Sequence, residues 1–368
     1  MKMKRIAAAV ISTALCLSTV LTGCGQENAA AGSAASQKAD APAAAGARQL
    51  TFTSSANANE TQGKFVQKFC DTVTELTDGA ITFKIYYGGT LCGEEEELQY
   101  IQNGSVDMAA IAHTDFADDL TYLQFPYALV TDQDNLLNYY NSILFENPET
   151  SKLIEDEAAQ QGVKLLGFMY CGQGAFVSRT PATSLHDLEG KKFGCVIPGA
   201  WEDYGVSLVN LVPPDIYDAL SRGVVDASCC SFAPCYEMCW YEVADYWMLY
   251  GDLSVGNPLT INLDTWNSLS QQEQEAFQQA AKTALEDTVT LNNDIENGYI
   301  QDLKDRGCTV TTVTGEDQQF YSEHDFRLNA RNGLEFAAKN GKIDNMKTII
   351  SACAEYTGID VSDILAEY

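Results

Sequence analysis

One long helical stretch constrains the fold of this chain more than any other feature. It starts at Ser270, which with Glu273 three residues later has the spacing of a capping box, and it stops at Gly307. About 36 residues at a rise of 1.5 Å give a helix of roughly 54 Å, which exceeds the width of one lobe. We therefore expect a helix that runs behind two lobes.

The chain before this helix alternates between strand and helix patterns. Ile81 to Tyr86 alternates apolar and polar residues, and Gly79 and Gly88 stand at turns. Repeated β-α-β units with short glycine turns indicate an α/β domain with a largely parallel sheet. The first series comprises strands at 50–53, 81–86 and 106–112 and helices at 60–76 and 94–103.

A second series of elements follows Gly162. We expect the chain to return to the first lobe through 259–262, and to end in a strand and helices after the long helix. The expected strands are 164–168, 192–197, 224–227, 259–262 and 308–313, and the expected helices are 201–211, 216–221, 316–340 and 346–356.

The N-terminus has the features of an export signal. A basic start precedes an apolar run from Ile6 to Val20, which is short for a membrane span. The sequence Leu21-Thr22-Gly23-Cys24 resembles a bacterial lipobox, whose cysteine becomes lipid-modified. The stretch after it is rich in small and polar residues and predicts a disordered linker. We expect a signal peptide at 1–23, a linker at 24–49 and a protein anchored to the outer face of the bacterial cytoplasmic membrane.

Composition narrows the classes of partner. The formal net charge of −29 over 368 residues argues against binding nucleic acid or an anionic membrane surface. Twelve cysteines and three histidines are present, but the cluster at 229, 230, 235 and 239 lacks the paired spacing of a zinc knuckle. We expect no metal and no cofactor.

Five stretches resemble the solute receptors of tripartite ATP-independent periplasmic (TRAP) transporters, the DctP type. The strongest is Ile216 to Asp226, IYDALSRGVVD, which is similar to the family signature VYxALQxGxVD. Asp187 to Lys192 resembles the family's DLKGLK. The other three stretches are 69–87, 88–95 and 104–109.

This resemblance implies a periplasmic-binding-protein fold: two α/β lobes, hinge strands and a long helix spanning both. It places lobe I at 50–170 plus about 257–290, and lobe II at 171–256 plus about 300–368. It further implies a monomer that catalyses no reaction, closes on a small solute and delivers it to a small and a large TRAP membrane subunit.

The resemblance also carries pocket positions to this chain. On the first lobe these are Ser55, Asn57, Glu94, His113 and Thr114. Those of the second lobe are Gly174, Gly194 and Cys230, to which Trp201, Tyr204 and Tyr217 are added as an aromatic wall near Phe232. Most of these positions lie at the carboxyl ends of strands, where α/β sheets bind ligands.

The chain departs from the family where most members hold a carboxylate with an arginine. Gly194 takes that place, and Lys192 and Arg179 are the nearest cations. Because a carboxylate closed into such a site needs a charged partner, we expect a ligand other than a standard dicarboxylate, uncharged or cationic and possibly aromatic.

Three alternatives remain open from sequence. The chain contains no Gly-x-Ser-x-Gly, His-Glu-x-x-His or phosphate-loop motif, which disfavours an enzyme. The receptor of an ATP-driven importer also has two hinged α/β lobes and a lipid anchor. A sensory receptor for a membrane kinase shares both fold and site.

Overall fold

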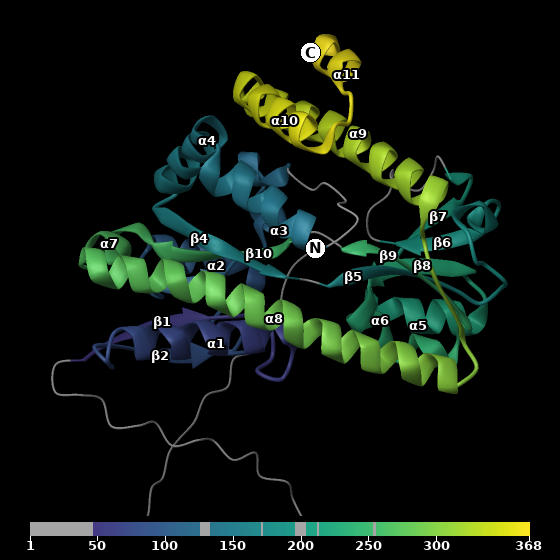
Figure 1. Ribbon diagram of the computed structural model, residues 1–368, viewed down its shortest axis with the longest axis horizontal. Coiled ribbons are helices and arrows are strands. Elements are labelled where there is room, and N and C mark those ends of the chain that lie inside the picture. Colours follow the sequence, from purple (N-terminus) through teal and green to yellow (C-terminus); the bar gives the residue numbers. More distant parts are fainter. Residues whose placement is uncertain (1–46, 126–132, 171, 196–203, 212, 253–254) are drawn as a thin grey trace, which may run out of the picture. The chain divides into compact units, whose positions relative to one another are not determined.

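The computed structural model describes residues 47–125, 133–170, 172–195, 204–211, 213–252 and 255–368 (Figure 1). The predicted signal peptide, the lipid-modified Cys24 and nearly all of the predicted linker lie outside these residues. Within them, no helix is both long enough and apolar enough to span a membrane.

The first sheet has five strands in the order β2-β1-β3-β10-β4. β1 pairs in parallel with β2 and β3, whereas β10 is antiparallel to β3 and β4. The sheet is therefore mixed and not largely parallel, because β10 returns from the second half of the chain in the opposite direction. The strands are β1 Arg48–Thr53, β2 Ile81–Tyr86, β3 Met108–Ala110, β4 Val163–Tyr170 and β10 Val255–Asn262.

The second sheet has six strands in the order β11-β9-β5-β8-β6-β7. It too is mixed, since β5 is antiparallel to both β8 and β9. β5 and β9 were not predicted. The strands are β5 Gln173–Ser178, β6 Lys192–Cys195, β7 Ser207–Asn210, β8 Ala227–Ser231, β9 Tyr246–Asp252 and β11 Thr309–Thr312.

Two local predictions for this sheet were wrong. We expected a helix over 201–211, but β7 pairs in parallel with β6, and Leu208 and Val209 pack against different clusters, as alternating strand side chains do. We expected a strand at 224–227, but the backbone N–H groups of Val224 and Val225 donate to Ala219 O, which delays the strand to Ala227.

Helices cover both sheets. Those on the first half are α1 Thr61–Leu76, α2 Glu97–Gln102, α3 Gln133–Asn141 and α4 Pro148–Gln160, with short helical turns η1 Glu94–Glu96, η2 His113–Phe116, η3 Thr121–Gln124 and η4 Ser142–Glu146. Those of the second half are η5 Leu185–Leu188, α5 Pro213–Arg222, α6 Phe232–Glu237, η7 Trp240–Glu242, α7 Leu263–Asn267, α8 Gln271–Asp305, α9 Gly315–Lys339, α10 Ile343–Thr357 and α11 Ser362–Glu367.

The predicted long helix is α8, the long green helix of Figure 1, with 35 residues. Its capping box is present: Ser270 N donates to Glu273 Oε2 at 2.7 Å, and Glu273 N donates to Ser270 Oγ at 3.3 Å. Phe277 near its start packs in the core with β1 and α1, and Leu303 near its end packs with β5 and α6. α8 therefore contacts the cores of both sheets, as expected.

The chain crosses between the sheets three times, from β4 to β5, from β9 to β10 and, through α8, from β10 to β11. A residue of α8 forms hydrogen bonds with the first residue of β5, at the end of the segment that connects β4 to β5. Glu296, which is 2% exposed, accepts hydrogen bonds from Gln173 N at 3.3 Å and from Gln173 Nε2 at 2.9 Å. Gly172 lies directly before this contact with φ of +81°, a conformation that glycine adopts without strain.

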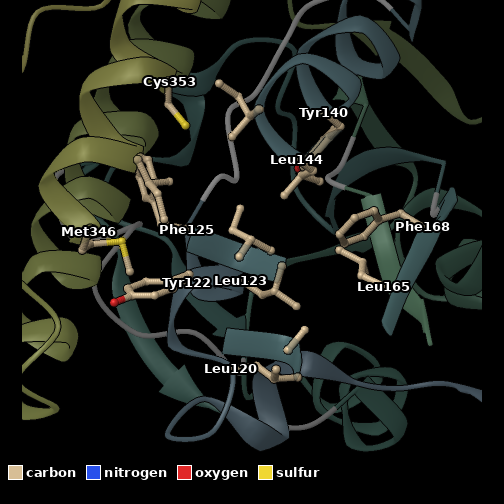
Figure 2. Close-up of a cluster of buried hydrophobic side chains, with 14 of the residues drawn as sticks. Leu120, Tyr122, Leu123, Phe125, Tyr140, Leu144, Leu165, Phe168, Met346 and Cys353 are labelled. Atoms are coloured by element: carbon tan, nitrogen blue, oxygen red, sulfur yellow. The ribbon is translucent and has the colours of Figure 1, made fainter. Parts of the chain in front are cut away.

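The C-terminal helices pack mainly with the first sheet. Tyr321 and Leu328 of α9 pack in a core of the second sheet, but Phe326, Ala330, Leu334 and Ala337 join a cluster that also contains residues of β4. Figure 2 shows Met346 of α10 in that cluster beside Tyr122, whose OH accepts a 2.7 Å hydrogen bond from Asn345. These core contacts differ from our expectation that 300–368 belongs to lobe II, and the lobe boundaries stay a prediction.

Candidate functional site

Two predicted site residues meet at the end of β1. Ser55 follows this strand, and its Oγ donates a hydrogen bond to Glu94 Oε1 at 3.2 Å. Asn57 is exposed, and its backbone N and Nδ2 donate to Glu60 at 3.0 and 2.7 Å. Ser55 and Glu94 are therefore in contact. Asn57 instead bonds Glu60, the residue that precedes α1.

The same place holds a carboxyl group that we did not predict. Glu97 begins α2 and is 0% exposed, and neither of its Oε atoms has a hydrogen-bond partner within the described residues. Burial, followed by the negative charge of Glu94, raises the pKa of Glu97 to about 9, against the stabilising N–H of Ser55. Glu97 is therefore protonated and neutral near pH 7.

His113 and Thr114 stand in η2, directly after β3. This is the carboxyl end of β3, beside that of β1, as predicted. Their side chains lie outside the described part of the structure. The neighbouring Asp115 contributes to the raised pKa of Glu97, so η2 lies close to α2.

On the second sheet, three predicted positions lie on adjacent strands. Gly174 is in β5, Cys230 in β8 and Gly194 in β6, and Ser228 Oγ donates to Gly194 O at 2.6 Å. A Cβ at Gly194 would meet Ile216 Cδ1 at 2.9 Å, so this position faces the apolar packing beneath α5. Gly194 can therefore offer a ligand its backbone only.

The space beside Gly174 is filled by Tyr250, a residue that sequence reasoning missed. A Cβ at Gly174 would collide with the Tyr250 ring, which packs against Phe176 and Tyr321 with centroid distances of 4.3 and 5.1 Å. Asp325 of α9 is close by, and burial raises its pKa to about 7, although Asn329 Nδ2 donates to it at 2.8 Å. Asp325 is thus, after Glu97, a second carboxyl group with a raised pKa near the predicted site positions, and it lies close to the aromatic rings of Tyr250 and Tyr321.

The described residues of the predicted aromatic wall lie in two different hydrophobic clusters. Trp201 lies outside the described residues. Tyr204 packs with Phe320 at a centroid distance of 5.5 Å in one core of the second sheet. Tyr217 contacts the other core, and its OH donates to Glu242 at 2.8 Å. Phe232 lies in that second core against Trp247, at 5.9 Å between centroids.

Comparison with known proteins decides the family. The model of the bacterial extracellular solute-binding proteins, family 7 (DctP), matches residues 52–325. The chain belongs to family 7. Solute binding, and not a catalysed reaction, defines this family, in agreement with the resemblance found in the sequence.

Two relatives of this family 7 protein differ in their named ligands. The ectoine/5-hydroxyectoine-binding periplasmic protein UehA of Ruegeria pomeroyi is 25% identical over 307 residues, which cover 80% of this chain and 88% of UehA. The C4-dicarboxylate-binding periplasmic protein DctP of Rhodobacter capsulatus is 23% identical over 279 residues, or 71% and 79% of the two chains.

Solved structures share the fold of this family 7 protein. A TRAP periplasmic solute-binding protein of Rhodobacter sphaeroides in an apo open form matches with a TM-score of 0.70 and 21% identity, covering 84% of this chain and 98% of that one. One of Desulfovibrio salexigens with bound orotic acid matches with a TM-score of 0.66 and 18% identity, covering 84% and 99%. The two-sheet architecture is thus that of TRAP solute-binding proteins.

The family 7 protein also has a surface pocket of about 500 Å³ beside Tyr204. Apart from Tyr204 it contains no predicted site residue. It is lined by Leu185, His186, Glu189, Tyr204, Gly205, Glu316, Asp317 and Phe320.

The cysteines of the described residues are all free thiols. A hydrogen bond from Cys235 lowers the pKa of Cys230, while burial raises the pKa of Cys229 and Cys235. Within the same residues, no group of three or more His, Cys, Asp or Glu side chains is arranged to hold a metal.

Proposed function

We propose that this family 7 protein is a lipid-anchored receptor that delivers a small organic solute to a TRAP-type importer. The observation that carries the proposal is the family match over 52–325, which spans strands of both sheets and all of α8. The lipobox-like sequence ending at Cys24 supports attachment to the outer face of the cytoplasmic membrane.

The solute in this proposal is not a standard dicarboxylate. Gly194 stands where the family resemblance places an arginine, and its Cβ direction is filled by apolar side chains. The negative charges of Glu94 and Asp115, which raise the pKa of Glu97, also disfavour an anionic solute because they repel it. The relative named for ectoine, a small organic solute, is consistent with such a site.

Transport by reconstituted membrane subunits tests this function. Proteoliposomes that contain the small and large TRAP subunits of the same organism are expected to accumulate the solute only when the receptor and an ion gradient are both present. A requirement for ATP would assign the receptor to an ATP-driven importer. Signalling through a membrane kinase without uptake would assign it to sensing.

A further inference from the structure

Glu97 lies at the edge of the first sheet where the predicted ligand residues gather. Ser55 follows β1 and bonds Glu94, and the Ser55 N–H faces the Glu97 carboxyl group. Asp115 of η2 adds a negative charge from the end of β3. Glu94 of the same acidic run and Asp115 of η2 therefore both add negative charge near Glu97.

Among the described residues, the Ser55 N–H is the one group that offsets the burial of the Glu97 carboxyl group, and it lies outside hydrogen-bond geometry. The side chain is completely buried, and both oxygens lack a hydrogen-bond partner among the described residues. Its neighbours Leu98 and Ile101 belong to a hydrophobic core, where an apolar side chain at position 97 would avoid an unsatisfied polar group. Such unfavourable groups are retained in proteins mainly where they bind or react.

A positively charged nitrogen group has the chemistry to satisfy this site. An ammonium or amidinium group donates several hydrogen bonds and favours ionised carboxylates. A metal ion is the less suitable occupant, because no metal-binding group of three or more side chains exists among the described residues. An anionic ligand would meet the charges of Glu94 and Asp115.

We propose that Glu97 and Glu94 together bind the positively charged nitrogen group of the solute, and that Glu97 releases its proton to solvent when the solute binds. The neutral carboxyl group becomes a carboxylate paired with the cation, so that the charge of the site changes by one proton for each solute bound. This inference rests on the proposed receptor function and adds the class of its solute.

Titration calorimetry of the purified protein tests the inference with four probes. The two cationic probes are putrescine, a dication, and ectoine, a zwitterion that carries an amidinium group beside its carboxylate, whereas succinate and galacturonate are simple anions. We expect a cationic probe to bind and to release about one proton near neutral pH, seen as different apparent enthalpies in phosphate and in Tris. Glu97→Gln should weaken this binding by about tenfold or more and abolish the proton release.

Glu95→Gln is the matched control, because it removes the same charge from an exposed side chain two residues away. It should bind the probe and release the proton as the wild type does. Binding without proton release, binding that Glu97→Gln leaves unchanged, or no binding of either cationic probe would overturn the inference. Tight binding of an anionic probe alone would overturn it while leaving the receptor function intact.

Discussion

At the scale of single residues, Glu97 sets a pH dependence of stability. Its pKa rises from an ordinary value of 4.5 to about 9 on folding. Between these values the folded state holds one more proton than the unfolded state, so the free energy of unfolding falls as pH rises. We expect Glu97→Gln to be more stable than the wild type by about 1–3 kcal/mol near pH 8.

Denaturant unfolding between about pH 5 and about pH 9 measures this effect, because the slope of stability with pH counts the protons bound. The curve of Glu97→Gln should decline less steeply than that of the wild type, and Glu95→Gln should follow the wild type. Parallel curves for Glu97→Gln and the wild type would show that Glu97 titrates normally.

Sequence reasoning predicted two of the residues that the structure brings together beside Glu97. Ser55 and Glu94 follow a strand and a glycine turn, which are local signals. Glu97 lies in the same acidic run with Leu98 and Ile101, a spacing typical of one buried helix face, yet four consecutive glutamates usually indicate an exposed helix start. Tyr250 was missed because only the pairing of β5 with β9 brings it to Gly174.

At the scale of elements, the contact between α8 and the β4–β5 crossing depends on Gly172. A Cβ there would collide with Glu296 Oε1 and meet Asn292 Nδ2 at 2.7 Å, in a conformation that side chains rarely adopt. We expect Gly172→Ala to lower the free energy of unfolding by about 2 kcal/mol, measured by denaturant unfolding.

Gly162→Ala separates backbone strain from collision. Gly162 has a similar φ of +70°, but a Cβ there would meet nothing within 4 Å. Its substitution should cost about 1 kcal/mol, which is the strain alone. If Gly172→Ala and Gly162→Ala lost the same free energy of unfolding, the contact of Glu296 with the β4–β5 crossing would contribute nothing to stability.

The elements differ in how well sequence predicts them. α8 and β2 were predicted closely, because a capping box and strict alternation are local patterns. β5 and β7 were not predicted: β5 is buried between β8 and β9, and β7 is a short strand fixed by pairing with β6. Such strands depend on contacts between distant segments more than on their own residues.

At the scale of the whole molecule, the proposed anchor makes its own prediction. Cys24→Ser should abolish the incorporation of labelled fatty acid and move the protein from the membrane fraction to the soluble one, because one residue carries the lipid. Cys16→Ser, within the predicted signal peptide, should leave both unchanged. Continued lipid labelling of Cys24→Ser would show that Cys24 is not the lipid-modified residue.

The sequence also predicted the two-lobed fold, since the family signature at 216–226 and the length of α8 are both specific. It did not predict that α10 packs with the first sheet. That contact joins Met346 to Tyr122 across more than half of the chain, and no local pattern encodes it.

Native mass spectrometry of the protein purified without denaturation tests the central claim most directly. The account predicts one small solute per chain that bears a positively charged nitrogen group and is recovered chemically unchanged after unfolding. Recovery of a simple dicarboxylate, or of a product formed from the added solute, would contradict it.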